Sequence, residues 1–289
     1  MNDVIAYFEH IPSAHRSLIL VSGITVFWLL ESAVPLFRFS YQKWSHAGIN
    51  FFFTFTTILV NFVLAFILVK TVDWTTQAQI GLLHWVAMPV WVQLIAGLLL
   101  MDFVGAWLAH WTEHHIWWLW QFHTIHHSDT HVDTTTANRH HPGESVIRFL
   151  FTTLAIVITG APMWLVFLYQ SLSVVLSQFN HANIVLPAWA DKAMSWLIVT
   201  PNMHHVHHHY ALPLSNTNYG NIFSVWDRLL GTFVQVDNQK LVYGLDTYTN
   251  PAEHQHIGNM LKLPFKGYRP PVATEQPDPQ PPRAVKPVL

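Results

Sequence analysis

The chain has 289 residues, of which 51% are hydrophobic and only 10% are charged, with a formal net charge of −2. About a quarter of the residues in an ordinary soluble domain are charged, so this composition excludes a typical soluble enzyme, and so few basic residues exclude a nucleic-acid-binding surface. The chain has no cysteine, and therefore no disulfide, iron–sulfur cluster or thiol nucleophile, but it has 21 histidines. These features predict an all-α, multi-pass membrane protein that is unusually rich in imidazole.

Three long apolar stretches predict membrane-spanning helices. Residues 17–37 can cross a hydrocarbon core of about 30 Å; the stretch is too long for a signal-peptide core and lacks a small-residue cleavage site, so we interpret it as a retained anchor. Its Glu31 should face other helices or lie near an interface. The second stretch, residues 47–69, is uncharged. In the third, Pro89 interrupts the apolar sequence and the predicted span covers residues 90–108.

A fourth apolar block, residues 148–179, predicts a helical hairpin. Gly160 and Pro162 divide it into pieces of 12 and 17 residues, each short for a full crossing. Alternate crossing by the three spans places the loop with Arg38 and Lys43 on the same side as everything after residue 110. The positive-inside tendency makes that side cytoplasmic, in a bacterial inner membrane or the endoplasmic reticulum, with the N-terminus outside.

Fifteen of the 21 histidines lie between residues 110 and 209. Eight of them form three groups with helical spacing: His110 and His114; His123, His126 and His127; His204, His207 and His208. Positions i, i+3 and i+4 share one face of a helix, so each group can direct two or three imidazoles at one point. Eight imidazoles suit two metal ions in a shared site better than one tetrahedral zinc ion.

Other chemistries fit these histidines less well. The spacing around Glu113 differs from the His-Glu-x-x-His pattern of zinc proteases, and none of the carboxylates near the histidine groups forms the Glu-x-x-His pattern of carboxylate-bridged di-iron bundles. The segment from His141 to Glu144 is similar to the heme-binding turn of cytochrome b5 domains, but no soluble domain surrounds it. His141 itself is at least as well explained by a polar contact with Arg139 or the backbone as by metal ligation.

The three groups resemble the histidine boxes of the fatty acid hydroxylase/sterol desaturase superfamily, which are integral membrane oxygenases. The boxes H-x3–4-H, H-x2–3-H-H and again H-x2–3-H-H correspond here to residues 110–114, 123–127 and 204–208. Two departures stand out: Trp111 occupies a place where many members have arginine, and one more residue than expected separates Asp102 from the first box. The flanks also agree: Leu119-Trp120-Gln-Phe-His123, Ser128, Arg139-His-His141-Pro142, Phe179-Asn-His181-Ala-Asn183, Pro201 and residues 218–233.

This resemblance implies a non-heme di-iron centre that activates O₂ and hydroxylates, or desaturates, a lipid C–H bond. The implied metal ligands are the eight grouped histidines and one further histidine: His110, His114, His123, His126, His127, His181, His204, His207 and His208. Polar side chains expected beside these ligands are Asp102 and Glu113, as acceptors for imidazole N–H groups, and Asn183. Zinc is the expected replacement for iron in an overexpressed preparation.

The implied partners are a lipid substrate, the membrane and a separate electron-donor protein of the ferredoxin, cytochrome b5 or reductase type, because the chain has no flavin, heme or iron–sulfur motif. The predicted regions are 1–84 with the N-terminal membrane helices, 85–235 with the catalytic part, and 236–289 as a C-terminal extension. From about residue 269 this extension is proline-rich and predicted to be poorly ordered. A membrane metal-ion transporter or metal-binding protein, and a bis-histidine heme electron carrier, remain as alternative functions.

Overall fold

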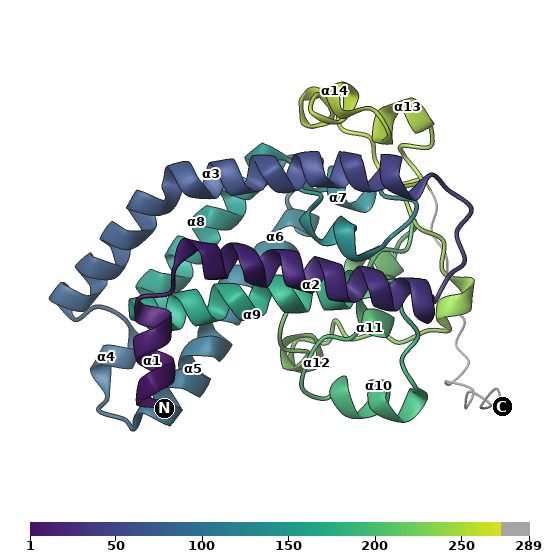
Figure 1. Cartoon of the computed structure of the whole chain (residues 1–289). Coiled ribbons are helices and arrows are strands. Elements are labelled where there is room, and N and C mark those ends of the chain that lie inside the picture. The colour runs from purple at the N-terminus through teal and green to yellow at the C-terminus, as the bar shows by residue number, and fades with distance from the viewer. Residues whose placement is uncertain (273–289) are drawn as a thin grey trace.

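The computed structural model describes residues 1–272 and consists of helices and connecting loops (Figure 1). Within this range it forms no strand and only three isolated backbone bridges, so the predicted all-α class is confirmed for the described residues. The first half contains α1 (Asn2–Glu9), α2 (Ser13–Ala33), α3 (Lys43–Ala78), α4 (Leu82–Trp85), α5 (Val90–Asp102), the π-helix η1 (Phe103–Leu108), α6 (Ala109–His115), α7 (Trp117–His127) and the 3-10 helix η2 (Thr134–Asn138). The second half contains α8 (Pro142–Thr159), α9 (Met163–His181), α10 (Ala188–Met194), α11 (Pro201–His207), η3 (Leu214–Asn216), α12 (Val225–Leu229), η4 (Asn238–Lys240), α13 (Pro251–His254), α14 (Ile257–Met260) and η5 (Leu263–Phe265).

Four helical segments are long and apolar enough to cross a membrane, as a multi-pass membrane protein requires. They are Ser13–Ala33, Lys43–Trp85, Val90–His115 and Pro142–Thr159. The first three contain most or all of the predicted spans, and α5 begins directly after Pro89, as expected for a residue that starts helices but interrupts them elsewhere. The fourth is the first arm of the predicted hairpin.

The ends of the first two membrane helices differ from the predicted ones. α2 ends at Ala33, four residues before the end of the predicted span, because Val34 precedes a proline and the residue before proline avoids helical geometry. α3 continues nine residues beyond the predicted end. Lys70 does not stop it, because its ammonium group lies over the Phe66 ring, 5.5 Å from the centroid. With 36 residues, α3 is about 54 Å long and exceeds the hydrocarbon thickness.

The predicted hairpin is present, but its arms are longer than the apolar pieces. α8 has 18 residues and α9 has 19, because α8 begins at Pro142, where polar residues are buried by pairing, and α9 continues to His181. Gly160 caps α8 with a φ of 70°, a left-handed conformation that glycine adopts without strain. A Cβ on Gly81, in the loop after α3, would lie 2.2 Å from the Gly160 nitrogen, so the two glycines let this loop and the hairpin turn touch.

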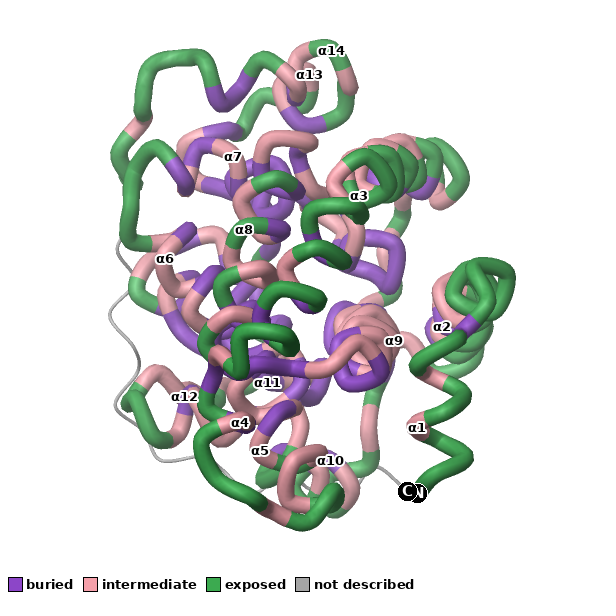
Figure 2. Tube along the Cα trace, turned by 90° about the vertical axis from the view of Figure 1, so that its left-hand side faces the viewer, coloured by how far each residue is buried: buried purple, intermediate pink, exposed green. Residues whose placement is uncertain are grey.

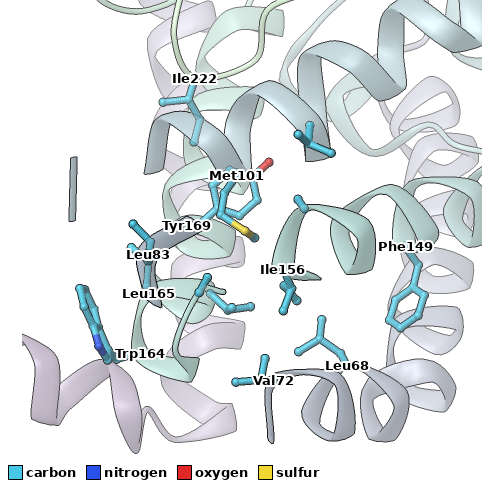
Figure 3. Close-up of a cluster of buried hydrophobic side chains, with 14 residues drawn as sticks. Leu68, Val72, Leu83, Met101, Phe149, Ile156, Trp164, Leu165, Tyr169 and Ile222 are labelled. Atoms are coloured by element: carbon cyan, nitrogen blue, oxygen red, sulfur yellow. The ribbon is translucent and has the colours of Figure 1, made fainter. Parts of the chain in front are cut away.

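The helices pack around two different interiors. α8 packs against α3 and η1, and α9 packs against α1 and α2. An apolar core between α3, α5, α8 and α9 surrounds Met101, Ile156 and Leu165, which are fully buried (Figure 3). In Figure 2, exposed residues follow the outer sides of α2 and α3, whereas buried residues gather where α6, α7, α9 and α11 approach one another. That second interior contains the histidines.

The C-terminal extension lies over the histidine-rich part of the molecule. Gln121 of α7 donates to the carbonyl of Pro264 (3.0 Å), and the buried guanidinium of Arg139 donates to the carbonyl of His254 (2.7 Å). The proline-rich tail was predicted to be poorly ordered from about residue 269. From residue 273 onward this segment lies outside the described residues.

Candidate metal centre

Nine histidines from four helices converge in the second interior. α6 supplies His110 and His114, α7 supplies His123, His126 and His127, α9 ends with His181, and α11 with its C-terminal cap supplies His204, His207 and His208. The i, i+4 pairs of each box stay together as their spacing predicted, but the second and third boxes do not direct all three imidazoles at one point: His126 and His207, at i+3, join the opposite set, and the tertiary fold adds His181. All nine histidines implied as ligands by the family resemblance lie together.

The nine imidazoles form two groups. The ligand atoms of five lie within 4.8 Å of one another, and so do those of the other four. The five-imidazole group contains His110, His114, His123, His127 and His207; the four-imidazole group contains His126, His181, His204 and His208. The groups are adjacent, since the rings of His127 and His208 stack with centroids 4.7 Å apart.

Hydrogen bonds at the outer ring nitrogens orient five of these rings. In each, Nδ1 lies 2.7–3.0 Å from a carbonyl, amide or carboxylate oxygen, which makes Nδ1 the protonated nitrogen and leaves the Nε2 lone pair directed inward. The pairs are His110 with Tyr219, His114 with Asn216, His123 with Glu144, His181 with Ser177, and His207 with Thr217.

The inward nitrogens approach one another in a way that suits metal ions. The Nε2···Nε2 distances are 3.1 Å for His110–His123, His114–His127 and His126–His181, and 3.0 Å for His181–His204. Two nitrogens at this separation, each bonded to one ion at about 2.1 Å, subtend about 95° at that ion. Among the described residues, Nε2 of His207 and both ring nitrogens of His208 are buried without a hydrogen-bond partner. The donor set therefore fits two transition-metal ions.

Burial keeps the imidazoles neutral, as metal ligands must be. Desolvation lowers the pKa of His123 to about 4, although the neighbouring Glu144 opposes this shift. The pKa of His207 is lowered to about 3, first by burial and then by the positive charge that a protonated His123 would carry. The pKa values of His126 and His204 are also well below the usual range for the same reasons. At neutral pH these rings offer lone pairs and carry no protons that a metal would have to displace.

Glu144 is the carboxylate that holds the centre, and sequence reasoning did not assign it. Its Oε1 accepts from Nδ1 of His123 and Nδ1 of His140, both at 2.7 Å, and from Nε of Arg148 at 3.0 Å. Glu113, the expected acceptor, instead binds Arg148 at 2.7 Å and lies 3.7 Å from His123 Nδ1, too far for a hydrogen bond. The i, i+4 spacing of Glu144 and Arg148 was the one feature of the sequence that could have indicated that Glu144 lies on a helix beside the histidines.

The other two polar side chains expected beside the ligands serve elsewhere. Asp102 accepts from the backbone N–H groups of Ile222 and Phe223 at 3.2 and 3.1 Å and from the indole N–H of Trp226. Asn183 accepts from the backbone N–H of Phe37 at 2.8 Å and donates to its carbonyl. In the described part of the chain neither hydrogen-bonds to an imidazole, because loop backbone saturates the carboxylate of Asp102 and the amide of Asn183.

The π-helix before the first box explains the extra residue noted in the sequence. A π-helical turn is one residue inserted into an α-helix, and η1 lies between Asp102 and His110. With the insertion, both residues face the segment 218–227: Asp102 holds its Ile222 amide, and His110 donates to its Tyr219 carbonyl at 2.9 Å. The added residue therefore lets His110, a candidate metal ligand, and Asp102 hold the same loop.

The remaining histidines of this region lie outside the two groups. Nδ1 of His141 accepts from the N–H of Gly143 (2.9 Å) and caps α8, as a backbone contact rather than a ligand would. His205 is hydrogen-bonded to the hydroxyl of Tyr243, and His115 is exposed. His140 forms a third, smaller group with His123 and Glu144.

Comparison with known proteins places the same residues in one family. A family model described as fatty acid hydroxylase matches residues 94–232, the range that contains all nine imidazoles. An ornithine lipid hydroxylase of Rhizobium tropici is 28% identical over 145 residues, covering 50% of this chain and 43% of that protein. The alkylglycerol monooxygenase of Homo sapiens is 29% identical over 178 residues, covering 59% and 36%.

A very-long-chain aldehyde decarbonylase of Oryza sativa is 25% identical over 166 residues, covering 56% of this chain and 61% of that protein. The chain thus spans less than half the length of the first two relatives. No solved structure matches it. The matched region coincides with the residues that build both imidazole groups, so residues 94–232 form a fatty acid hydroxylase region, and the resemblance to the fatty acid hydroxylase/sterol desaturase superfamily predicted from the histidine boxes is confirmed.

Proposed function

We propose that the chain is an integral-membrane, non-heme di-iron oxygenase that hydroxylates, or desaturates, a lipid C–H bond with O₂ and electrons from a separate protein. The observation that supports this most strongly is the convergence of nine neutral imidazoles, eight of them in buried residues, in two adjacent groups. The relatives are named as lipid hydroxylases and monooxygenases, which supports the same reaction class. The five-imidazole and four-imidazole groups would each hold one iron ion.

When bound, the iron pair would supply O₂ activation and oxidation of the C–H bond. The chain's own residues prepare this chemistry: Glu144 and the backbone carbonyls hold Nδ1–H groups, so that the Nε2 atoms stay fixed in place. Neutral ligands leave the metal charge uncompensated, and burial excludes bulk water from the ligand atoms. The net hydroxylation, RH + O₂ + 2e⁻ + 2H⁺ → ROH + H₂O, requires two electrons that only an external donor can supply.

We also propose that the centre faces the cytoplasm. The ligands lie near the ends of helices, and the loop with Arg38 and Lys43 lies on the same side of the predicted spans as the region from residue 110 onward. The sparse basic residues follow the positive-inside tendency in this orientation. A donor protein would then reach the centre from the aqueous side, while lipid approaches from the bilayer.

The function is tested by anaerobic purification with metal analysis, together with lipid analysis of expressing cells. We expect about two iron ions per chain and an oxygenated or newly unsaturated lipid, with zinc replacing iron after aerobic overexpression. His126→Ala and His207→Ala, one from each group, should each lose bound metal and product. His115→Ala is the matched control, because His115 is adjacent to His114 in sequence but exposed and outside both groups.

Two outcomes would contradict the proposal. Unchanged product in either ligand variant would remove the assignment of that group to the centre. Metal flux across vesicles with unaltered lipids would favour the transporter hypothesis.

A further inference from the structure

A small cavity of about 210 Å³ opens beside the five-imidazole group. Its walls come from three separate parts of the chain: the α6–α7 corner with His114 and Trp120, the segment 210–216, and the C-terminal extension between residues 245 and 271. The C-terminal extension, which does not contribute to either imidazole group, therefore contributes one wall of a space that reaches a candidate metal ligand.

His114 is the point at which this cavity meets the centre. The other eight imidazole-bearing residues are buried, whereas His114 is only half-buried, although its ring nitrogens are enclosed. Its Nδ1 lies 3.0 Å from the amide oxygen of Asn216, which also lines the cavity, and its Nε2 lies 3.1 Å from Nε2 of His127. A group seated in the cavity would therefore lie against His114, whose Nε2 belongs to the candidate metal site.

The residues that line the cavity favour a ligand that donates hydrogen bonds over an anionic ligand. The guanidinium of Arg269 is already neutralised, because it donates to both carboxylate oxygens of Glu253 at 2.7 and 3.0 Å and to the Thr247 carbonyl at 2.9 Å. Asp246, Ser215 and Thr247 also line the space, and Oδ2 of Asp246 accepts from the backbone N–H of Val272 at 2.6 Å. Carboxylate and hydroxyl oxygens accept hydrogen bonds from hydroxyl or amine groups.

The size and position of the cavity suit one end of a lipid. Pockets that enclose whole small molecules measure about 300–1,000 Å³, so 210 Å³ cannot enclose a complete amphiphile. Tyr268 of the rim has its ring 6.4 Å from Trp117, and both side chains are substantially exposed, as are Trp118 and Phe265. Such aromatic residues favour the level of lipid headgroups. The mouth thus lies where polar ends of membrane lipids are concentrated.

We propose that this cavity binds the hydroxyl- or amine-bearing polar end of the lipid substrate, so that the oxidised carbon lies within or next to that end rather than far along an acyl chain. This inference rests on the proposed oxygenase function for its chemical consequence. Thr247 and Tyr268 act as specificity-determining residues of the rim, and the Arg269–Glu253 pair holds the wall that carries them.

The experiment uses two synthetic aminolipid probes in phosphatidylcholine vesicles with the full chain. One probe carries a diazirine beside its free amine, and the other carries it at the middle of the acyl chain. After illumination, the labelled peptides are mapped by mass spectrometry. Thr247→Trp should fill the cavity, and Thr249→Trp is the matched control, since Thr249 lies two residues further on the same loop, is exposed and does not line the space.

We expect the head-labelled probe to modify peptides from residues 210–216 or 245–271, with at least a tenfold loss in Thr247→Trp and none in Thr249→Trp. Both variants should retain wild-type metal content. Labelling of these peptides by the mid-chain probe, or undiminished head labelling in Thr247→Trp, would overturn the assignment. So would a lipid product whose new oxygen or double bond lies far along the acyl chain.

The test separates the two proposals. If the head-labelled probe modifies the cavity but iron-loaded protein with a chemical reductant oxidises no lipid, the oxygenase function fails and the binding site remains. If lipid is oxidised but head labelling misses the cavity, the binding site fails and the function remains.

Discussion

Glu144 has an unusual concentration of partners for one carboxylate. A single oxygen accepts from two imidazoles and a guanidinium, and the carboxylate is fully buried. The contact with His123 fixes which nitrogen of that ring points inward. Acceptors of this kind tune metal affinity because they hold the ring in place and increase its basicity.

Replacing Glu144 by glutamine should therefore weaken metal binding by about 10–100-fold while keeping the shape of the side chain. The reason is that a neutral amide is a poorer acceptor for the His123 N–H group. Metal affinity is measured by competition with a chelator of known strength. Glu113→Gln is the matched control, since Glu113 binds Arg148 but does not reach His123. An equal loss in both variants would show that Arg148, not His123, carries the effect.

At the scale of single residues, the sequence predicted which imidazoles come together better than it predicted which side chains hydrogen-bond to them. Helical spacing brought eight imidazoles to one site, because residues three and four apart share a face in any helix, but it did not show that His126 and His207 would each join the group opposite to the rest of their box. The partners of Asp102 and Asn183 depended on where loops from distant parts of the chain lie, about which spacing says nothing. Proximity in sequence to a box, which favoured Glu113, did not indicate which carboxylate reaches a ring.

Among the elements, η1 links membrane helix and metal site. Because each residue of an α-helix turns the chain by about 100°, the inserted residue decides whether Asp102 and His110 can hold the same loop. The sequence showed the insertion as an extra residue, and the structure shows where it is accommodated.

Deleting Ala106 should convert η1 to regular α-helix and rotate His110 out of phase with Asp102. We expect the variant to insert into membranes but to lose metal from the five-imidazole group, measured as metal content per chain. The control restores the count by adding one alanine after Phe103 in the deletion variant, which should recover binding. Full metal content in the deletion variant would mean that the phase between the two residues is unimportant.

Helix positions were predicted well and helix ends less well. Apolar run length located the spans, but α3 extends beyond its run, and α8 begins before its own because the buried Glu144 is paired with the half-buried Arg148. The predicted lengths followed the apolar runs alone, whereas ion pairing and packing over an aromatic ring let helices continue into charged sequence.

The whole molecule has its two kinds of interior at different places along the long helices. The hairpin turn and the apolar core lie toward one end of α8 and α9, and Glu144 and His181 lie at the other. Residues 160–162 predicted the hairpin, but not that both of its free ends would meet the histidines. That meeting is a property of the complete helix arrangement.

The proposed orientation can be measured because the chain has no cysteine to compete with a label. We introduce Gln77→Cys at the exposed end of α3 and, separately, Thr249→Cys in the C-terminal extension. A membrane-impermeant maleimide should label only the first in intact cells, since the proposed orientation places the two positions on opposite sides of the bilayer. Detergent-permeabilised cells provide the control in which both react. The reverse pattern would place the metal centre outside.

The hairpin formed by α8 and α9 connects the two imidazole groups through the polypeptide itself. One arm carries Glu144, which accepts a hydrogen bond from His123 of the five-imidazole group, and the other ends in His181 of the four-imidazole group. Their common pivot is the glycine contact at Gly160, about 27 Å along α8 from its start. The relative position of the two imidazole groups is therefore set partly by how Gly81 and Gly160 meet at the opposite end of these helices, far from any histidine of the two groups.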